Sequence, residues 1–396
     1  MTLAAWAHGM AALVALLLVS PAIFLFLQVL LAPRRPALAA ATGSRLPVAV
    51  LIPAHNEALG IAATLQPLMQ QIRPGDRVVV VADNCTDDTA LIARCCGAEA
   101  VERHDLLLRG KGHALNHGVQ HLSADPPDVL VMLDADCMIH PGALDRLAQV
   151  CRATAMPCQA LYLMRSPVPA SLRLRFAEFA WTVKNQVRPA GSQRIGGPCQ
   201  LMGTGMAFPW PLISKASLAS GHLAEDMKLG AELAAAGHAP AFVPSALVTS
   251  VFPTGDAATR SQRRRWEQGH LATIFKDGPA LVGHAVRQRS LATLLFAFDL
   301  MVPPLALLVL LLLALAAAGL VLMFLWGWAM PLGLAGIGVI CVVLAIGLAW
   351  FRHARHLLSG SELLLAPWYL VKKLPLYADM LLRRSSGWVR AKREGE

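Results

Sequence analysis

Residues 129–136 read Val-Leu-Val-Met-Leu-Asp-Ala-Asp, an apolar run that ends in two alternating carboxylates. A short apolar run predicts a buried strand, so Asp134 and Asp136 would lie just beyond its carboxyl end. Carboxylate oxygens are ligands that Mg²⁺ or Mn²⁺ takes together with substrate phosphates. The alternative is a turn followed by a capped helix that begins near Pro141, because Asp is also common in turns and helix caps.

Strands and helices are predicted to alternate on the amino-terminal side of this run. Such alternation is typical of an α/β domain with a mainly parallel sheet covered by helices on both faces. The pattern gives strand 47–52, helix 57–71, strand 77–82, a helix from about 86, an ambiguous segment 101–108, helix 112–122 and strand 129–133.

Polar clusters directly follow three of these predicted strands. Their sequences are Pro53-Ala-His-Asn-Glu57, Asp83-Asn-Cys-Thr-Asp87 and Asp134-Ala-Asp136. Each cluster alone is explained by turn or cap chemistry. Parallel strands, however, end at the same edge of a sheet, where α/β domains bind ligands. Three clusters on one edge therefore favour a ligand site.

The composition excludes a purely water-soluble globule. Hydrophobic residues make up 56% of the 396 residues and charged residues 15%, against about 25% charged in an ordinary soluble domain. Mean hydropathy is +0.51. The length gives ample core, so neither a disordered chain nor a small disulfide scaffold is expected. The eight cysteines contain no C-x-x-C pair, and neither zinc nor a disulfide framework is predicted.

The hydrophobic excess predicts three membrane spans. Met10 to Leu31 carries no charge and is long enough to cross roughly 30 Å of hydrocarbon. Leu300 to Phe351 is also uncharged and fits two spans joined near residues 327–331. A signal peptide cleaved in the Ala-rich 37–41 segment is the alternative for the first span. The tail 361–388 suits a helix in the membrane surface, and a further short span is its alternative.

Positive charges predict the orientation. Arg34 and Arg35 follow the first span, and Arg352 and Arg355 follow the last, which places these ends on the cytosolic side of an inner (plasma) membrane. The net charge of +10 is then explained by lipid headgroups, and no nucleic acid is expected as a partner. The expected division is an anchor 1–32, a cytosolic domain 33–285, two transmembrane helices 286–355 and an amphipathic tail 356–396.

Six motifs together carry a resemblance. They are P-A-H-N-E (53–57), A-D-N-C-T-D-D-T (82–89), K-G-H-A-L-N (111–116), L-D-A-D (133–136), A-E-D (224–226) and Q-R-R-R-W (262–266). In this order the chain, over about residues 46–276, resembles the family-2 inverting glycosyltransferases and their membrane-bound branch of cellulose- and hyaluronan-synthase type. The resemblance implies a GT-A-type nucleotide-binding domain.

The resemblance also implies roles for individual residues. The donor would be a nucleotide diphosphate sugar, with UDP favoured, and the cofactor Mg²⁺ or Mn²⁺. The implied donor-binding residues are Pro53, Glu57, Asp83, Lys111 and Asp134, with Asp134 and Asp136 on the metal. The chain departs from the family pattern at Asn84-Cys85 and at Ala224, which weakens any transfer of donor specificity.

The acceptor side is implied to contain Asp226 as the general base that takes the proton of the attacking hydroxyl. The alternative is that Glu225 and Asp226 only favour the start of a helix running to about residue 236. Gln262, Arg265 and Trp266 would share one helix face against acceptor and diphosphate, or else line an interfacial basic helix. The segment 203–206 resembles a small-residue acceptor loop.

The expected function is therefore sugar transfer, with inversion, to a lipid-linked or growing polysaccharide acceptor in exopolysaccharide or glycolipid biosynthesis. Three spans are few for threading a polymer, so a single transfer to a lipid-linked acceptor is favoured over a processive polysaccharide synthase. A sugar nucleotidyltransferase is the alternative from another class, but it has no use for Q-R-R-R-W or for membrane anchoring. A non-catalytic scaffold would not need these motifs.

Overall fold

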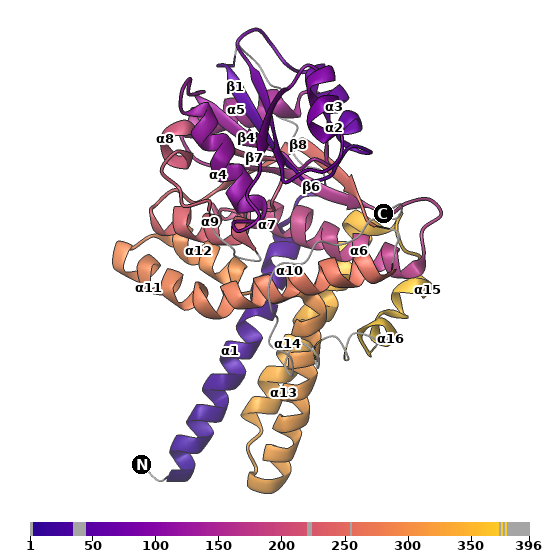
Figure 1. Cartoon of the computed structure of the whole chain (residues 1–396). Coiled ribbons are helices and arrows are strands. Elements are labelled where there is room, and N and C mark those ends of the chain that lie inside the picture. The colour runs from indigo at the N-terminus through magenta and orange to yellow at the C-terminus, as the bar shows by residue number, and fades with distance from the viewer. Residues whose placement is uncertain are drawn as a thin grey trace.

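The computed structural model describes residues 3–34, 45–219, 224–253, 256–371, 374 and 377, with no side chains described for 3–5 and 256–265. An α/β domain lies at one end and three long helices extend from it (Figure 1). A layer of shorter helices lies between the two parts. The expected α/β class with added membrane-type helices is confirmed.

An eight-stranded mixed sheet forms the centre of the domain, in the order β3-β2-β1-β4-β7-β6-β8-β5. The strands β3, β2, β1 and β4 are mutually parallel, β6 is parallel to β8, and β7 and β5 run antiparallel to their neighbours. The strand bounds are β1 Val48–Ala54, β2 Arg77–Asp83, β3 Glu99–Arg103, β4 Val129–Met132, β5 Met138–Ile139, β6 Cys158–Arg165, β7 Met206–Pro209 and β8 Ala241–Val251.

Alternate residues of β1 pack on opposite faces, as the two-residue period of a strand requires. Val50 and Ile52 join a core that includes residues of α2 (Ile61–Met69), α3 (Thr89–Cys95) and α5 (Ala143–Thr154). Ala49 and Leu51 join a core with α4 (Lys111–Leu122) and α9 (Glu225–Ala235). The near-continuous apolar sequence of β1 therefore reflects burial on both faces.

The remaining helices connect the sheet to the long helices or form them. Their bounds are α1 Leu3–Leu31, α6 Leu172–Thr182, the π-helix η1 Val183–Val187, α7 Arg188–Arg194, α8 Trp210–Ile213, α10 Asp256–Lys276, α11 Gly278–Gln288, α12 Leu291–Leu300, α13 Leu305–Trp326, α14 Met330–Ala349, the π-helix η2 Trp350–Ala354, α15 Gly360–Leu363 and α16 Ala366–Val371.

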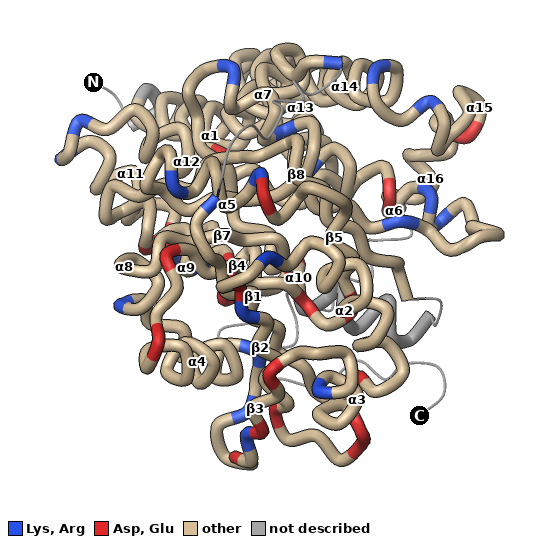
Figure 2. Tube along the Cα trace, turned by 90° about the horizontal axis from the view of Figure 1, so that it is seen from above, with Lys and Arg blue, Asp and Glu red and all other residues tan. Residues whose placement is uncertain are grey.

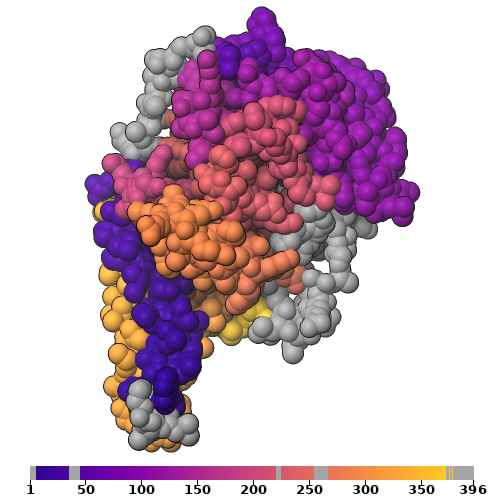
Figure 3. All heavy atoms as spheres, turned by 90° about the vertical axis from the view of Figure 1, so that its left-hand side faces the viewer, coloured from indigo at the N-terminus to yellow at the C-terminus, as the bar shows by residue number. Residues whose placement is uncertain are grey.

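Three helical segments are long and apolar enough to cross a membrane: Trp6–Leu31, Leu305–Trp326 and Met330–Ala354. They agree with the three predicted spans. Pro303 and Pro304 lie between α12 and α13, so these prolines mark the entry to a span rather than a kink within it. In the space-filling view, α1 runs beside α13 and α14 as a narrow stalk below the broader domain (Figure 3).

The outer part of the sheet, around β3 and α3, carries many charged residues (Figure 2). Seen from above, acidic and basic residues are interspersed around β3 and α3 (Figure 2). Arg77 pairs with Glu99, and Arg94 pairs with Glu102. The ambiguous segment 101–108 proves to contain the end of β3, and the helix expected from Glu57 begins at Ile61, because residues 57–60 form a turn.

Candidate active site

Asparagines connect the polar clusters after β1 and β2 to the next segment of the sheet edge. Asn56 and Asn84 both adopt left-handed backbone conformations, with φ of 52° and 54°. The amide oxygen of Asn56 accepts from the Thr86 backbone N–H at 2.8 Å, and that of Asn84 accepts from the Asp105 N–H at 2.8 Å. Asn tolerates this conformation and offers such bonds, which explains its use at both turns.

Asp83 lies at the end of β2 with its carboxylate buried. Arg103 donates to Asp83 Oδ1 at 2.6 Å, and the Asp83 carbonyl lies 2.6 Å from Nδ1 of His55. The aspartate thus ties β2 to β3 and to the loop after β1. Contact of this side chain with a nucleotide remains a prediction.

Lys111, at the start of α4, joins two motifs that are distant in sequence. Its Nζ lies 2.5 Å from Asp134 Oδ1 and donates to the carbonyl oxygen of Gly203 at 2.8 Å. Asp134 follows β4, and its backbone N–H donates to Thr204 Oγ1 at 3.0 Å. The ammonium group therefore sits between the acidic pair and the segment 203–206.

The loop at Gly203 has a conformation that only glycine adopts readily. Its φ is +86°, and a Cβ added there would lie 3.4 Å from Asp226 Oδ2 and 3.7 Å from Lys111 Nζ. Fully buried Gln159 of β6 holds this loop: its amide donates to the Thr204 carbonyl at 2.9 Å and accepts from the Met202 N–H at 2.8 Å. The loop is thus fixed against the central sheet.

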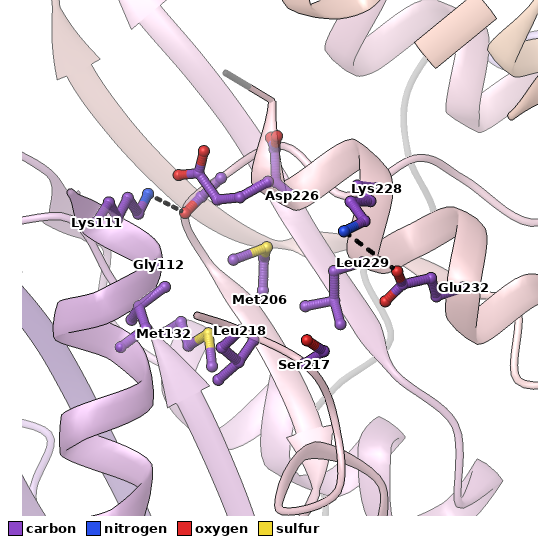
Figure 4. A pocket seen from close by; sticks show the side chains of 13 residues that line it. Lys111, Gly112, Met132, Met206, Ser217, Leu218, Asp226, Lys228, Leu229 and Glu232 are labelled. Carbon is purple, nitrogen blue, oxygen red and sulfur yellow. Dashed lines mark hydrogen bonds and ion pairs between the residues drawn. The ribbon is translucent and has the colours of Figure 1, made fainter. Parts of the chain in front are cut away.

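Glu225 and Asp226 begin α9, which confirms the predicted helix at this position. Both line a pocket together with Lys111 and Gly203. Figure 4 shows Lys111 and Asp226 along one side of this pocket, with Lys228 and Glu232 farther along α9. Both acids stand in the first turn of α9, where the helix dipole favours negative charge.

The charges of the pocket act on one another. Burial lowers the pKa of Lys111, but the carboxylates of Asp134 and Glu225 outweigh this and hold that pKa above its ordinary value. Burial, reinforced by neighbouring carboxylates, raises the pKa of Asp134 and of Glu225. Lys111 thus lies among the carboxylates of Asp134, Glu225 and Asp226, and such an acidic environment suits a divalent cation.

Asp134 and Asp136 have the chemistry and spacing for that cation. Their carboxylates and the Cys137 thiol offer ligand atoms that all lie within 4.8 Å of one another. Burial raises the pKa of Cys137 well above its ordinary value, so this thiol stays protonated. Two carboxylates fit Mg²⁺ or Mn²⁺, which take further oxygens from phosphates and water.

The other predicted site residues lie in different places. Pro53 is buried within β1 opposite Val81, and the Glu57 N–H donates to Thr89 Oγ1 at 2.8 Å. Gln262 and Arg265 fall on α10, as expected of a helix, but their side chains are outside the described ones. Trp266 does not line the pocket of Asp226. Its ring lies 5.1 Å from that of Trp181, beside a separate apolar cavity.

Two residues near the site were not identified from the sequence, Gln159 and Lys184. Gln159 stands within an apolar strand, and a polar residue at a buried strand position was a detectable signal. Lys184 lies in a π-helix, with its Nζ 5.8 Å from the centroid of the Trp181 ring. The sequence around Lys184 contains no recognisable motif, although π-helical turns often accompany functional sites.

The sequence profile of the glycosyltransferase-like family 2 matches residues 45–269. YdaM of Bacillus subtilis (strain 168), a probable glycosyltransferase, is 25% identical over 248 residues, which are 58% of this chain and 56% of YdaM. The 4,4'-diaponeurosporenoate glycosyltransferase of Staphylococcus aureus (strain MRSA252) is 38% identical over 90 residues, which are 22% of this chain and 23% of that protein. The matches thus span about half, or less, of these relatives' length.

A solved structure has the same fold over most of the chain. The mannosyltransferase PcManGT from Pyrobaculum calidifontis, solved in complex with GDP-Man and Mn²⁺, superposes with a TM-score of 0.50. The match covers 85% of this chain and 97% of that chain at 20% sequence identity. At this identity the likeness is one of fold, and it includes helices outside the sheet domain.

Proposed function

We propose that this chain, which belongs to the glycosyltransferase-like family 2, moves a sugar with inversion from a nucleotide diphosphate sugar to a hydroxyl of a membrane-associated acceptor. The observation that carries the proposal is the meeting of Lys111, Asp134 and Asp226 around Gly203, beside a domain joined to three candidate spans. At this place Lys111 can bind the donor's phosphates, and Asp226 can accept the proton of the acceptor hydroxyl.

The donor half of the proposed site lies after β1, β2 and β4. The turns that contain Glu57 and Asp83 would hold the base and ribose, and Lys111 would pair with a phosphate oxygen. Asp134 and Asp136 would hold Mg²⁺ or Mn²⁺ on the diphosphate. When bound, that ion neutralises the charge that develops on the leaving diphosphate.

The acceptor half is assigned to α9 and the loop at Gly203. Asp226 would accept the proton of the attacking hydroxyl, and a single displacement then inverts the anomeric carbon. Because Asp226 Oδ2 lies beside Gly203, the small residue leaves room for the acceptor close to the carboxylate. Gln262 and Arg265 of α10 are assigned to the acceptor or diphosphate.

The three candidate membrane spans support a lipid-linked acceptor. We assign residues 1–32 to an anchor, 33–285 to a cytosolic catalytic domain, 286–355 to a transmembrane pair and 356–396 to a surface tail of an inner-membrane protein. The diaponeurosporenoate named for the Staphylococcus relative and the GDP-Man in the Pyrobaculum structure illustrate different acceptors and donors within this fold. UDP remains the donor nucleotide that the motifs favour.

A donor screen tests this function. Membranes that contain the full chain and native lipids would be supplied with labelled UDP- and GDP-sugars plus Mn²⁺. Transfer of label to the lipid fraction, with release of nucleoside diphosphate, is the expected result. A nucleotidyltransferase would instead release pyrophosphate when UTP or GTP is supplied with a sugar 1-phosphate, and label in a growing polymer would indicate a processive synthase. Lack of transfer with every donor would contradict the proposal.

A further inference from the structure

A second, mainly apolar cavity of about 230 Å³ lies where the sheet domain meets the long helices. Leu25 of α1, Val309 of α13 and Ile346 of α14 line it from the candidate spans, and Phe176 of α6 and Tyr369 of α16 line it from the interfacial helices. Its walls therefore come from all three candidate spans and from the layer that would lie at the membrane surface.

Polar groups also contribute to the lining of this cavity. Lys184, Glu267 and His270 are among its lining residues, together with the neighbouring rings of Trp181 and Trp266. Burial, helped by Lys184 and Arg188, lowers the pKa of His270 to about 3, so its imidazole is neutral. The cavity is thus amphipathic, with mainly apolar walls and a few polar groups.

Strand β6 connects the cavity lining to the candidate active site. Trp181 and Asn185 both donate to the Tyr162 carbonyl of β6 at 3.2 Å, and Gln159 of the same strand holds the loop at Gly203. Burial lowers the pKa of Lys184, and the negative charge of Asp226, the candidate base, opposes this.

We propose that this cavity binds the hydrocarbon chain of the acceptor lipid and directs its hydroxyl-bearing head, past Lys184 and Trp266, towards Asp226. The ligand class is an amphiphile with a long apolar chain and a hydroxyl head. The apolar walls match the hydrocarbon chain, and the polar side chains of Lys184, Glu267 and His270 match the hydroxyl head. The inference rests on the proposed function, because it specifies the acceptor of that same reaction.

Filling the cavity provides the test. Ala180 of α6 lines the cavity and is exposed, so Ala180→Trp adds a large ring without displacing core side chains. Ala366→Trp fills it from α16. Ala314→Trp is the matched control, because Ala314 is exposed on α13 and does not line the cavity.

The full-length protein in lipid nanodiscs would be photolabelled with a long-chain alcohol that carries a mid-chain diazirine, and adducts would be mapped by mass spectrometry.

Adducts on α6 and on the first turns of α13 are expected in the wild type and in Ala314→Trp, with at least a tenfold loss in both cavity variants. Melting temperature and nucleotide binding should be unchanged in all four proteins. Equal labelling of the cavity segments in the wild type and both filled variants would overturn the proposal.

Transfer assays on the same samples separate this inference from the proposed function. A raised KM for the lipid acceptor in the filled variants, with unchanged nucleotide binding, supports both. If the wild type transfers sugar and neither Ala180→Trp nor Ala366→Trp loses transfer activity, only the cavity assignment is overturned. Cavity adducts in a protein that transfers no sugar overturn the proposed function and leave the lipid site in place.

Discussion

At the scale of single residues, Asp226 is the side chain on which the proposed chemistry depends most directly. Asp226→Asn keeps the size and hydrogen bonding of the side chain but cannot accept a proton. Sugar transfer should fall by roughly 10²–10⁴-fold, the usual range for loss of a general base, while the affinity for nucleotide stays nearly unchanged. Single-turnover transfer and calorimetric titration with UDP or GDP measure the two effects.

Asp125→Asn is the control for this substitution, because the Asp125 side chain is 87% exposed and does not line the pocket of Asp226. It should transfer sugar at nearly the wild-type rate. If Asp226→Asn keeps full activity, or only loses nucleotide, the base is misassigned and Glu225 is the next carboxylate to replace.

The proposed metal site makes a second prediction at this scale. Asp136→Ala should abolish the strengthening of nucleotide binding by Mn²⁺, because one of two oxygen ligands is lost. Asp125→Asn is a matched control, since the Asp125 side chain is 87% exposed. Titrations with and without a chelator measure the change. Activity that persists in excess chelator would contradict metal dependence.

Residue chemistry was predictable where a motif follows a strand. The rule that parallel strands end at one edge predicted that the clusters at residues 53–57, 83–87 and 134–136 lie together, whereas Lys111 and Asp226 were assigned from the family resemblance. Gln159 and Lys184 were not predicted, because their roles depend on contacts made across the chain: Gln159 reaches residues 202 and 204 through the antiparallel part of the sheet. Such pairing is set by tertiary packing rather than by local sequence.

At the scale of elements, the buried strands and the long apolar helices were the most predictable parts. Their signals are local, since both depend on apolar runs of characteristic length. The strands β5 and β8 illustrate the limit: β5 has two residues and pairs with β8, more than a hundred residues later. A run that short carries no strand signal, so its place at the sheet edge could not be inferred.

A buried polar network joins the first candidate span to the helices beside the sheet domain. Gln28 of α1 donates to Asp299 Oδ1 at 2.6 Å, and Arg188 and Gln200 donate to the same carboxylate group at 2.9 and 2.7 Å. Ser192 accepts from Gln28 as well, at 2.8 Å. Because each partner is buried, losing one leaves unsatisfied polar groups, so the network fixes α1 against α7.

Gly191 allows the close approach of these helices and gives a prediction for their packing. A Cβ at Gly191 would lie 1.8 Å from the Gln28 backbone oxygen, a contact that only helix displacement can relieve. Gly191→Ala should destabilise the protein by about 1–3 kcal/mol, the range for overpacking, and lower its melting temperature in detergent. Thermal unfolding monitored by tryptophan fluorescence measures the effect.

Gly336→Ala is the matched control for that substitution, because Gly336 lies in α14 and nothing lies within 4 Å of an added Cβ. It should leave the melting temperature unchanged or raise it slightly, since alanine favours a helix. A melting temperature of Gly191→Ala equal to that of Gly336→Ala would show that α1 and α7 do not pack as closely as described.

At the scale of the whole molecule, the orientation in the membrane decides which substrates the domain can reach. Arg352 lies at the domain end of the spans, where its Nη1 donates to the Leu30 carbonyl at 2.9 Å, and Trp326 and Trp328 lie at the opposite end. For a cation at the domain end, the positive-inside rule predicts that this end lies in the cytosol, where nucleotide sugars would be available. A green fluorescent protein fused after Glu396 should be fluorescent in bacterial cells, and alkaline phosphatase inserted after Gly327 should be active. The exchanged fusions serve as controls: alkaline phosphatase after Glu396 should be inactive, and green fluorescent protein after Gly327 should not fluoresce. An active phosphatase at Glu396 would put the tail outside, and the proposed use of cytosolic donors would then fail for a reason independent of any active-site residue.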